Sequence, residues 1–182
     1  LNMDISGKRM YSLLRKLDFE RLSTFEGEKK AADIIAEEIR NAGAEPIIET
    51  FDAPHYEIKN VKLEVTEPFK GTYEASGYGF SGNAAKDGIE ADFYYLESFD
   101  QMCLDGVKGK IVLVAGGIGI DSYKKLIKMG ALGFISTSGS WLDKKSDSDL
   151  EERMLREMFI DEGTIPGVCI RTVSYTHLTL PT

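Results

Sequence analysis

Apolar residues in the first part of the chain recur every three or four positions, which is the spacing of one face of an α-helix. This pattern predicts a helix over residues 6–17 and a second over residues 25–42. Ser23 and Glu26 have the spacing of a capping box before the second helix, and Gly43 stands where a helix commonly ends. The apolar faces comprise Met10, Leu13, Leu14 and Leu17 in the first helix, and Ala31, Ile34, Ile35, Ile39 and Ala42 in the second. Such faces usually pack against a protein core.

After Pro46 the pattern changes to alternation, which is typical of β-strands. It predicts strands over residues 47–51 and 58–65, and then short strands over 73–78 and 91–96. Pro68 and four following glycines interrupt the pattern, and we place a domain boundary there. The chain then divides into residues 1–67 and residues 68–172, with residues 173–182 as a separate tail.

The clearest pattern is a strand-helix-strand unit. It comprises a strand over 110–115, a turn with Gly116, Gly117 and Gly119, a helix from about Asp121 to Gly130, and a strand over 132–135. Residues 136–148 are polar and predict a loop, and residues 149–159 have helical spacing. A last strand spans 165–170, with Pro166 as its first residue or on an edge. The predicted fold class is α/β, in a mixed α+β arrangement with a β-rich second domain.

Composition narrows the possible functions. The 182 residues are 42% hydrophobic and carry a formal net charge of -8, with a pI near 4.9. Because Lys29 and Lys30 lie among acidic residues and form no basic stripe, we expect no nucleic-acid partner. The longest apolar run, 111–115, is far too short to span a membrane. The residues after Met3 lack the apolar core of a secretory signal, so we expect a cytoplasmic location.

Three glycines between a strand and a helix can cradle a phosphate. Gly116, Gly117 and Gly119 match neither GxGxxG nor a Walker motif, and Asp121 places a negative charge where a phosphate would bind. We therefore interpret them as a turn that needs positive φ before a helix capped by Asp121. A nucleotide-binding protein of flavodoxin-like design remains a third, more distant hypothesis.

Metal-binding and nucleophilic residues are sparse. Outside the tail, His55 is the only histidine, and Asp52 alone does not complete a metal site, so we interpret His55 as a loop residue. Cys103 and Cys169 have no metal or disulfide spacing and are interpreted as buried or free thiols. The serines Ser136, Ser138 and Ser140 are interpreted as loop residues, and the aromatic residues Tyr94, Tyr95 and Trp141 as cover for a sheet edge or core, or as contacts for a ligand.

Several segments resemble known families. The sequences GKIVLVAGG (109–117), YKKLIKMGALGFI (123–135) and IPGVCI (165–170), in this order, resemble a protease-associated domain. Upstream, RLSTFEGEKKAADIIA (21–36), followed by Gly43, resembles the entrance to a di-zinc aminopeptidase domain of the aminopeptidase Y type, related more distantly to glutamate carboxypeptidase and the transferrin receptor. Together the two resemblances cover most of residues 8–172.

The resemblance implies the front of an α/β zinc peptidase domain, followed by an inserted protease-associated domain that shapes substrate access or protein contacts. In that family, His, Asp and Glu residues hold two zinc ions and a further Glu acts as general base on peptide substrates. Because these residues normally follow the inserted domain and no position here matches them, we carry over no catalytic, cofactor-binding or metal-binding residue. We expect this polypeptide to bind no zinc and to be catalytically inert.

Two function classes remain open from the sequence. The favoured one is the amino-terminal part of a zinc-dependent exopeptidase, and the other is a non-catalytic binding or scaffold relative. The tail bears on this choice, because residues 173–182 resemble a translated sequencing adapter. We therefore expect the natural reading frame to break near Thr172.

Overall fold

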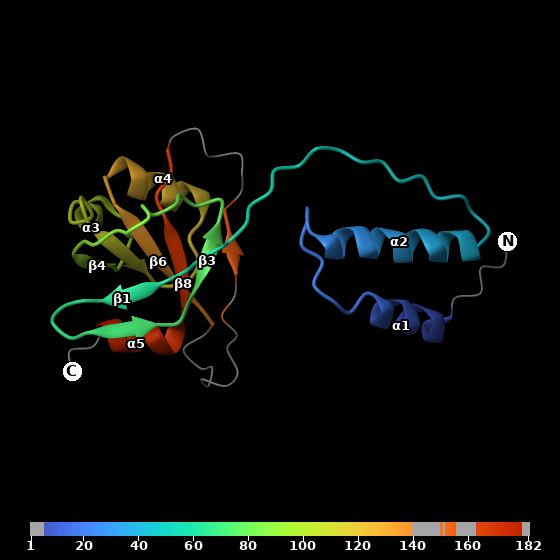
Figure 1. Cartoon of the computed structure of the whole chain (residues 1–182), viewed down its shortest axis with the longest axis horizontal. Coiled ribbons are helices and arrows are strands. Elements are labelled where there is room, and N and C mark those ends of the chain that lie inside the picture. The colour runs from blue at the N-terminus through green and yellow to red at the C-terminus, as the bar shows by residue number, and fades with distance from the viewer. Residues whose placement is uncertain (1–5, 140–149, 151, 156–162, 180–182) are drawn as a thin grey trace. The chain divides into compact units, whose positions relative to one another are not determined.

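The computed structural model describes residues 6–139, 150, 152–155 and 163–179. By their contacts, the residues form two compact units, Leu1–His55 and Tyr56–Thr182. The domain boundary predicted near Pro68 rests on Pro68 and the glycines that follow it, and it stays a prediction. Figure 1 shows the helices and strands of each unit.

The first unit contains the two predicted helices, α1 (Gly7–Lys16) and α2 (Glu26–Asn41). Ser6 caps α1 by accepting the Arg9 backbone N–H at 3.3 Å. Gly43 has a φ of 84° just after α2, as its predicted position requires. The expected capping box of α2 is wrong, since Phe25 is the N-cap and its side chain makes no capping bond.

Glu28, and not Glu26, satisfies the backbone before α2. The Glu28 carboxylate accepts the Thr24 backbone N–H at 2.7 Å and the Ser23 hydroxyl at 3.4 Å. Thr24 also adopts a positive φ of 72°. A glutamate of the first turn therefore accepts a backbone N–H before the helix, but it is Glu28 binding Thr24 and not Glu26 binding Ser23.

Little of the first unit is buried. Among its described residues, only Ala31 and Ala36 of α2 are fully buried, and α1 has no buried residue. Lys16 links the helices through an ion pair with Glu38 at 2.7 Å. Four large side chains on the predicted faces are exposed to solvent, namely Met10 59%, Leu14 66%, Ile35 44% and Ile39 36%, whereas Leu13, Leu17 and Ile34 are half-buried.

The connection after α2 does not form the predicted strands in full. Residues 44–62 contain no helix or strand, so the strand predicted over 47–51 is wrong for this chain. The strand predicted over 58–65 is confirmed only at its end, as β1 (Leu63–Val65). A strand forms when a neighbour binds its backbone, and within the described residues no such neighbour lies beside residues 47–51.

The second unit contains a mixed six-stranded sheet. Its order is β4-β5-β6-β8-β3-β7, in which only the β3–β8 pairing is antiparallel. The strands are β3 (Ala75–Gly79), β4 (Phe93–Leu96), β5 (Ile111–Val114), β6 (Gly133–Ser138), β7 (Arg153–Met154) and β8 (Gly167–Arg171). A separate antiparallel pair joins β1 to β2 (Gly71–Tyr73). This arrangement confirms the mixed α/β fold class.

Helices cover both faces of the larger sheet (Figure 1). On one face, α3 (Gln101–Leu104) and α4 (Ile120–Lys128) bury side chains together with Val112 and Phe134. On the other face, Leu178 of α5 (Thr172–Thr179) packs against Leu113. Because successive side chains of a strand point to opposite faces, the apolar run of β5 supplies both cores.

Three sequence predictions for this unit require correction. Residues 136–138, predicted as loop, form the end of β6 and are buried, because their backbone pairs with residues 169–171 of β8 despite their polar side chains. The helix predicted over 149–159 is wrong where the structure describes it, because Arg153 and Met154 pair with β3 as β7. The strand predicted over 73–78 is divided between β2 and β3 at Glu74.

Candidate functional site

The glycine turn between β5 and α4 is occupied by the protein's own groups. The Gly116 N–H donates to the Thr137 hydroxyl at 2.6 Å, and the Gly116 carbonyl accepts the Thr137 N–H at 3.2 Å. In front of Gly117, Nη1 of Arg153 lies 2.2 Å from the place a Cβ would take. The guanidinium of Arg153, from β7, therefore fills the space beside Gly117 that a side chain would need.

The backbone of this turn has the predicted positive φ at Gly116. Gly116 has a φ of 79°, and Gly119 is the N-cap of α4. The expected cap by Asp121 is wrong, because no side-chain capping bond is made and Asp121 lies in the first turn of the helix. Glycine at position 119 leaves the backbone to start the helix without a side-chain acceptor.

Two buried tyrosines form hydrogen bonds with the backbone near this turn. Tyr78 donates its hydroxyl to the Ile118 carbonyl at 3.2 Å. The Tyr123 hydroxyl donates to the Ile165 carbonyl at 3.0 Å and accepts the Ile165 N–H at 2.9 Å. Burial raises the pKa of both tyrosines, although their backbone hydrogen bonds oppose the rise. Both remain neutral near pH 7 and act as structural donors, not as general bases.

His55 and Asp52 do not form a metal site. The Nδ1 atom of His55 lies 2.9 Å from the Thr24 hydroxyl, and its ring lies 4.8 Å from the Phe25 ring. No three His, Cys, Asp or Glu side chains gather as a possible metal site anywhere in the described parts of the chain. The residues described here therefore do not fit the two zinc ions that the resemblance implies, and no reaction step can be derived through them.

Neither cysteine is in a disulfide, as expected. Cys169 is fully buried in β8, and Cys103 is half-buried in α3. The Ser98 hydroxyl lies near Cys103 and Asp100, and the Asp100 carboxylate caps α3 by accepting the Cys103 N–H at 3.0 Å. The hydroxyl of Ser98 and that backbone N–H lower the pKa of Asp100. Ser98, Asp100 and Cys103 therefore lie together because Asp100 caps α3.

The remaining candidate side chains have structural partners. Ser136 and Ser138 each donate to a β8 carbonyl at 3.4 Å, and Tyr94 donates to the Cys103 carbonyl at 2.8 Å. Tyr95 packs against the core beneath α5. Ser140 and Trp141 lie outside the described residues.

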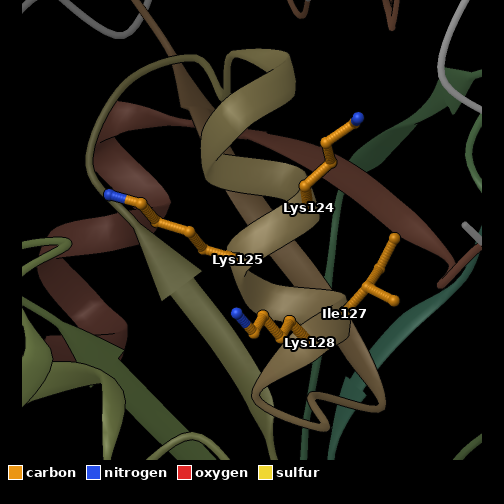
Figure 2. Close-up of a pocket in the computed structure, with 4 residues that line it drawn as sticks. All are labelled: Lys124, Lys125, Ile127 and Lys128. Carbon is orange, nitrogen blue, oxygen red and sulfur yellow. The ribbon is translucent and has the colours of Figure 1, made fainter.

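One hollow on the surface was missed by sequence reasoning. It has a volume of about 250 Å³ and is lined by Lys124, Lys125, Ile127 and Lys128 of α4. Figure 2 shows the lysine side chains spreading in different directions from the helix and not converging on one point. The K-K-x-x-K spacing of residues 124–128 was the available signal. Its chemistry is that of an open cationic surface and not of an enclosed active site.

The chain shares its fold with part of the zinc aminopeptidases. A zinc aminopeptidase from Bacillus subtilis, BSAP, superposes on this chain with a TM-score of 0.67 and 20% sequence identity. The match covers 98% of this chain and 42% of the BSAP chain. A peptidase M28 precursor from Shewanella amazonensis gives 0.64, with 18% identity over 92% and 42% of the two chains. An aminopeptidase from Aneurinibacillus sp. gives 0.54, with 19% identity over 95% and 40%.

These similarities confirm the fold that the sequence resemblance implied. The chain spans about two fifths of the length of the aminopeptidase structures that it matches. No family model and no curated protein sequence matches it. Among the described residues, no helix has the length and apolarity needed to cross a membrane.

Proposed function

We propose that this chain is the amino-terminal part of a zinc-dependent, aminopeptidase-like exopeptidase that acts on peptide substrates. The observation that carries the proposal is the shared fold with BSAP over 98% of the chain. The order of the motifs at residues 21–36, 109–117, 123–135 and 165–170 supports it independently. The zinc ligands and the general base belong to sequence beyond residue 172, and the 182 residues alone are inert.

Residues 68–172 form the protease-associated module in this proposal. The module shapes access to the catalytic centre or contacts other proteins. The adapter-like residues 173–182 are a tail of non-natural origin in the same proposal.

The first experiment is to sequence the source DNA across the codon for Thr172, with a library prepared without that adapter. We expect the frame to continue into a His-x-Asp motif and further Asp, Glu and His ligands. The longer polypeptide should then release amino acids from aminoacyl p-nitroanilides, lose that activity with a chelator and regain it with zinc. A continuing frame without these ligands would overturn the exopeptidase proposal.

The cationic surface of α4 favours a second candidate, a non-catalytic binding protein that uses the module as an interaction surface. Three lysines within five residues stand out in a chain of net charge -8, and would attract an acidic partner. Salt-sensitive binding of an acidic peptide, weakened by Lys124→Glu and Lys128→Glu together and unchanged by Lys62→Glu, would support this candidate. Absence of such binding would remove it.

A further inference from the structure

The carboxyl-terminal half of α4 carries a cationic surface with an apolar floor. Lys125 and Lys128 are exposed there, and Ile127 is half-buried and packs against the core. Lys108 lies beside the end of the same helix, since a Cβ built on Gly130 would be 3.4 Å from its Cγ. The α4 surface, as we call it, consists of the residues that line the hollow together with Lys108: Lys108, Lys124, Lys125, Ile127 and Lys128.

Three lysines of the α4 surface carry charges that the fold does not neutralise. Among the described residues, Lys108, Lys125 and Lys128 have no carboxylate within ion-pair distance. Other lysines of the unit do form ion pairs, as Lys110 does with Asp92 at 3.2 Å. Because these three charges are exposed on a chain of net charge -8, they make the α4 surface a place where an acidic partner can bind.

Helix stability explains only part of this pattern. Lys125 and Lys128 stand in the last turn of α4, where cations offset the partial negative charge of the helix carbonyls. That effect needs neither Lys108, which belongs to the turn before β5, nor an apolar residue between the lysines. The hollow over Ile127 is therefore better explained by a side chain of a partner than by the helix alone.

The size and shape of the hollow limit what it can hold. Pockets for drug-sized ligands span roughly 300–1,000 Å³, so a hollow of about 250 Å³ suits one or two side chains. The lysine side chains diverge, as Figure 2 shows, so one phosphate would not reach all of them. Phosphate recognition also favours the planar fork of arginine, whereas three lysines and an isoleucine line this hollow. An acidic polypeptide can offer a separate carboxylate to each lysine.

We propose that the α4 surface binds acidic polypeptide segments in which one apolar side chain lies between carboxylates. The apolar side chain packs in the hollow against Ile127 and the aliphatic stems of the lysines. The carboxylates pair with the ammonium groups around it. The consequence for substrates rests on the proposed function: in an exopeptidase, the α4 surface would hold acidic peptide substrates and so favour them over neutral ones.

The binding test uses the 182-residue protein and three fluorescein-labelled peptides. The first is Ser-Glu-Glu-Leu-Glu-Glu-Ser, the second has Ser in place of Leu, and the third has Lys in place of each Glu. In fluorescence anisotropy, we expect the first to bind at least about fivefold more tightly than the second, because only the first buries a leucine. The third should not bind. Equal binding of the first two peptides, or no saturable binding of the first, overturns the proposal.

Matched variants locate the contact. Lys125→Glu and Lys128→Glu together should weaken binding of the first peptide at least about tenfold. Lys70→Glu and Lys86→Glu together make the same charge change at exposed sites of the same unit and should alter it less than about twofold. Circular dichroism verifies that both double variants fold. Equal losses in the two would show general charge attraction and would overturn the proposal.

A second measurement does not depend on the variants. In the unsubstituted protein labelled with ¹⁵N, the first peptide should shift the amide resonances of residues 108 and 124–128 most. Shifts centred elsewhere would overturn the proposal. A single-stranded DNA of the same charge serves as the competing polyanion. If it shifts these amides and binds as tightly as the first peptide, the surface recognises charge alone and the assignment to acidic polypeptides is wrong.

The longer polypeptide separates this inference from the proposed function. Its kcat/KM is compared for the peptide Leu-Ala-Glu-Glu-Leu-Glu-Glu and for the same peptide with Gln in place of each Glu. Lys125→Glu with Lys128→Glu should lower the preference for the acidic peptide at least about fivefold, and Lys70→Glu with Lys86→Glu should not. If the short chain binds the first peptide at α4 and the longer one has no zinc-dependent activity, the surface stands and the proposed function fails. If the longer one is an active zinc peptidase whose preference the α4 variant does not change, selection of substrates by α4 is wrong and the function stands.

Discussion

The two units of the chain show similar apolar patterns with different outcomes. In the second unit the patterns close into two cores on opposite faces of a sheet, with Tyr123, Phe134 and Leu113 almost completely buried. In the first unit the helices form as predicted, yet the buried residues among those described are two alanines of α2. An amphipathic pattern thus identifies a face that needs a partner, and only the tertiary structure shows where that partner is.

Removing one aromatic ring should lower the free energy of unfolding much more in the second unit than in the first. Phe134 lies edge-on to Tyr78 and Tyr123, with ring centroids 5.1 and 5.6 Å away. Phe134→Ala should lower the free energy of unfolding by about 3–5 kcal/mol, because it leaves a cavity in the core. Phe51→Ala, at an exposed site, should change it by less than about 0.5 kcal/mol. Denaturant unfolding followed by circular dichroism measures both, and similar losses would break the comparison.

Adding a methyl group should also act differently in the two units. Gly77→Ala would bring a Cβ within 2.7 Å of Ile58, so we expect a loss of about 1–3 kcal/mol in the free energy of unfolding. Gly7→Ala meets no atom within 4 Å at the start of α1 and should stabilise that helix by about 0.5–1 kcal/mol. Thermal unfolding of the two variants gives the signs, and destabilisation by Gly7→Ala would contradict this account.

Tyr123→Phe tests the polar part of the second core. The substitution leaves the Ile165 N–H without its acceptor and should cost about 1–3 kcal/mol near pH 7. Burial raises the pKa of Tyr123 in the folded state above its ordinary value of 10.0. Its contribution to stability is therefore constant below about pH 10 and is lost as the pH rises through the folded pKa.

The measurement is the free energy of unfolding at several values between about pH 8 and 11. The decline above about pH 10 should be shallower in Tyr123→Phe than in the unsubstituted protein, with Tyr78 accounting for part of what remains. A variant whose decline is as steep as that of the unsubstituted protein would show that ionisation of Tyr123 is not coupled to unfolding.

The smallest effect is expected at the ion pair of the first unit. The Lys16 ammonium holds the pKa of Glu38 below its usual value of 4.5 through a hydrogen bond and direct attraction. The contribution of Glu38 is thus present above pH 4.5 and is lost as the pH falls through its folded pKa. Glu38→Gln should slightly speed amide exchange in α1 at pH 7 and not below pH 3, and added salt should reduce the difference. Asp33→Asn serves as the control, and an equal change there would remove the ion pair as the cause.

The sequence predicted the elements whose signals are local. Helical spacing and Gly43 located α1 and α2, and the apolar run at 111–114 with Gly116 and Gly130 located β5 and α4. Long-range pairing decided the rest. Residues 136–138 are polar, yet they lie in β6 because residues 169–171 of β8 pair with them. Residues 47–51 have strand-like composition, but they remain irregular without a neighbour.

The candidate site shows the same limit. The mismatches at Gly116, Gly117 and Gly119 were enough to favour a structural turn over a phosphate site. That Arg153 fills the space before Gly117 could not be predicted, since the two residues are far apart in sequence and the helix expected around Arg153 was wrong. The sequence shows three closely spaced lysines in α4, but only the fold shows that these lysines line a surface hollow.

The contacts of Tyr56 and Ile58 with the glycines of β3 have a practical consequence for cloning. A gene that starts at residue 68, where the protease-associated module is predicted to begin, would omit both side chains and expose Gly77 and Gly79 of β3, the strand beside the edge strand β7. It would also omit β1, the partner of β2. A gene that starts at Tyr56 keeps all of these contacts. The start that keeps the unit intact, Tyr56, therefore lies twelve codons before the domain boundary predicted at residue 68.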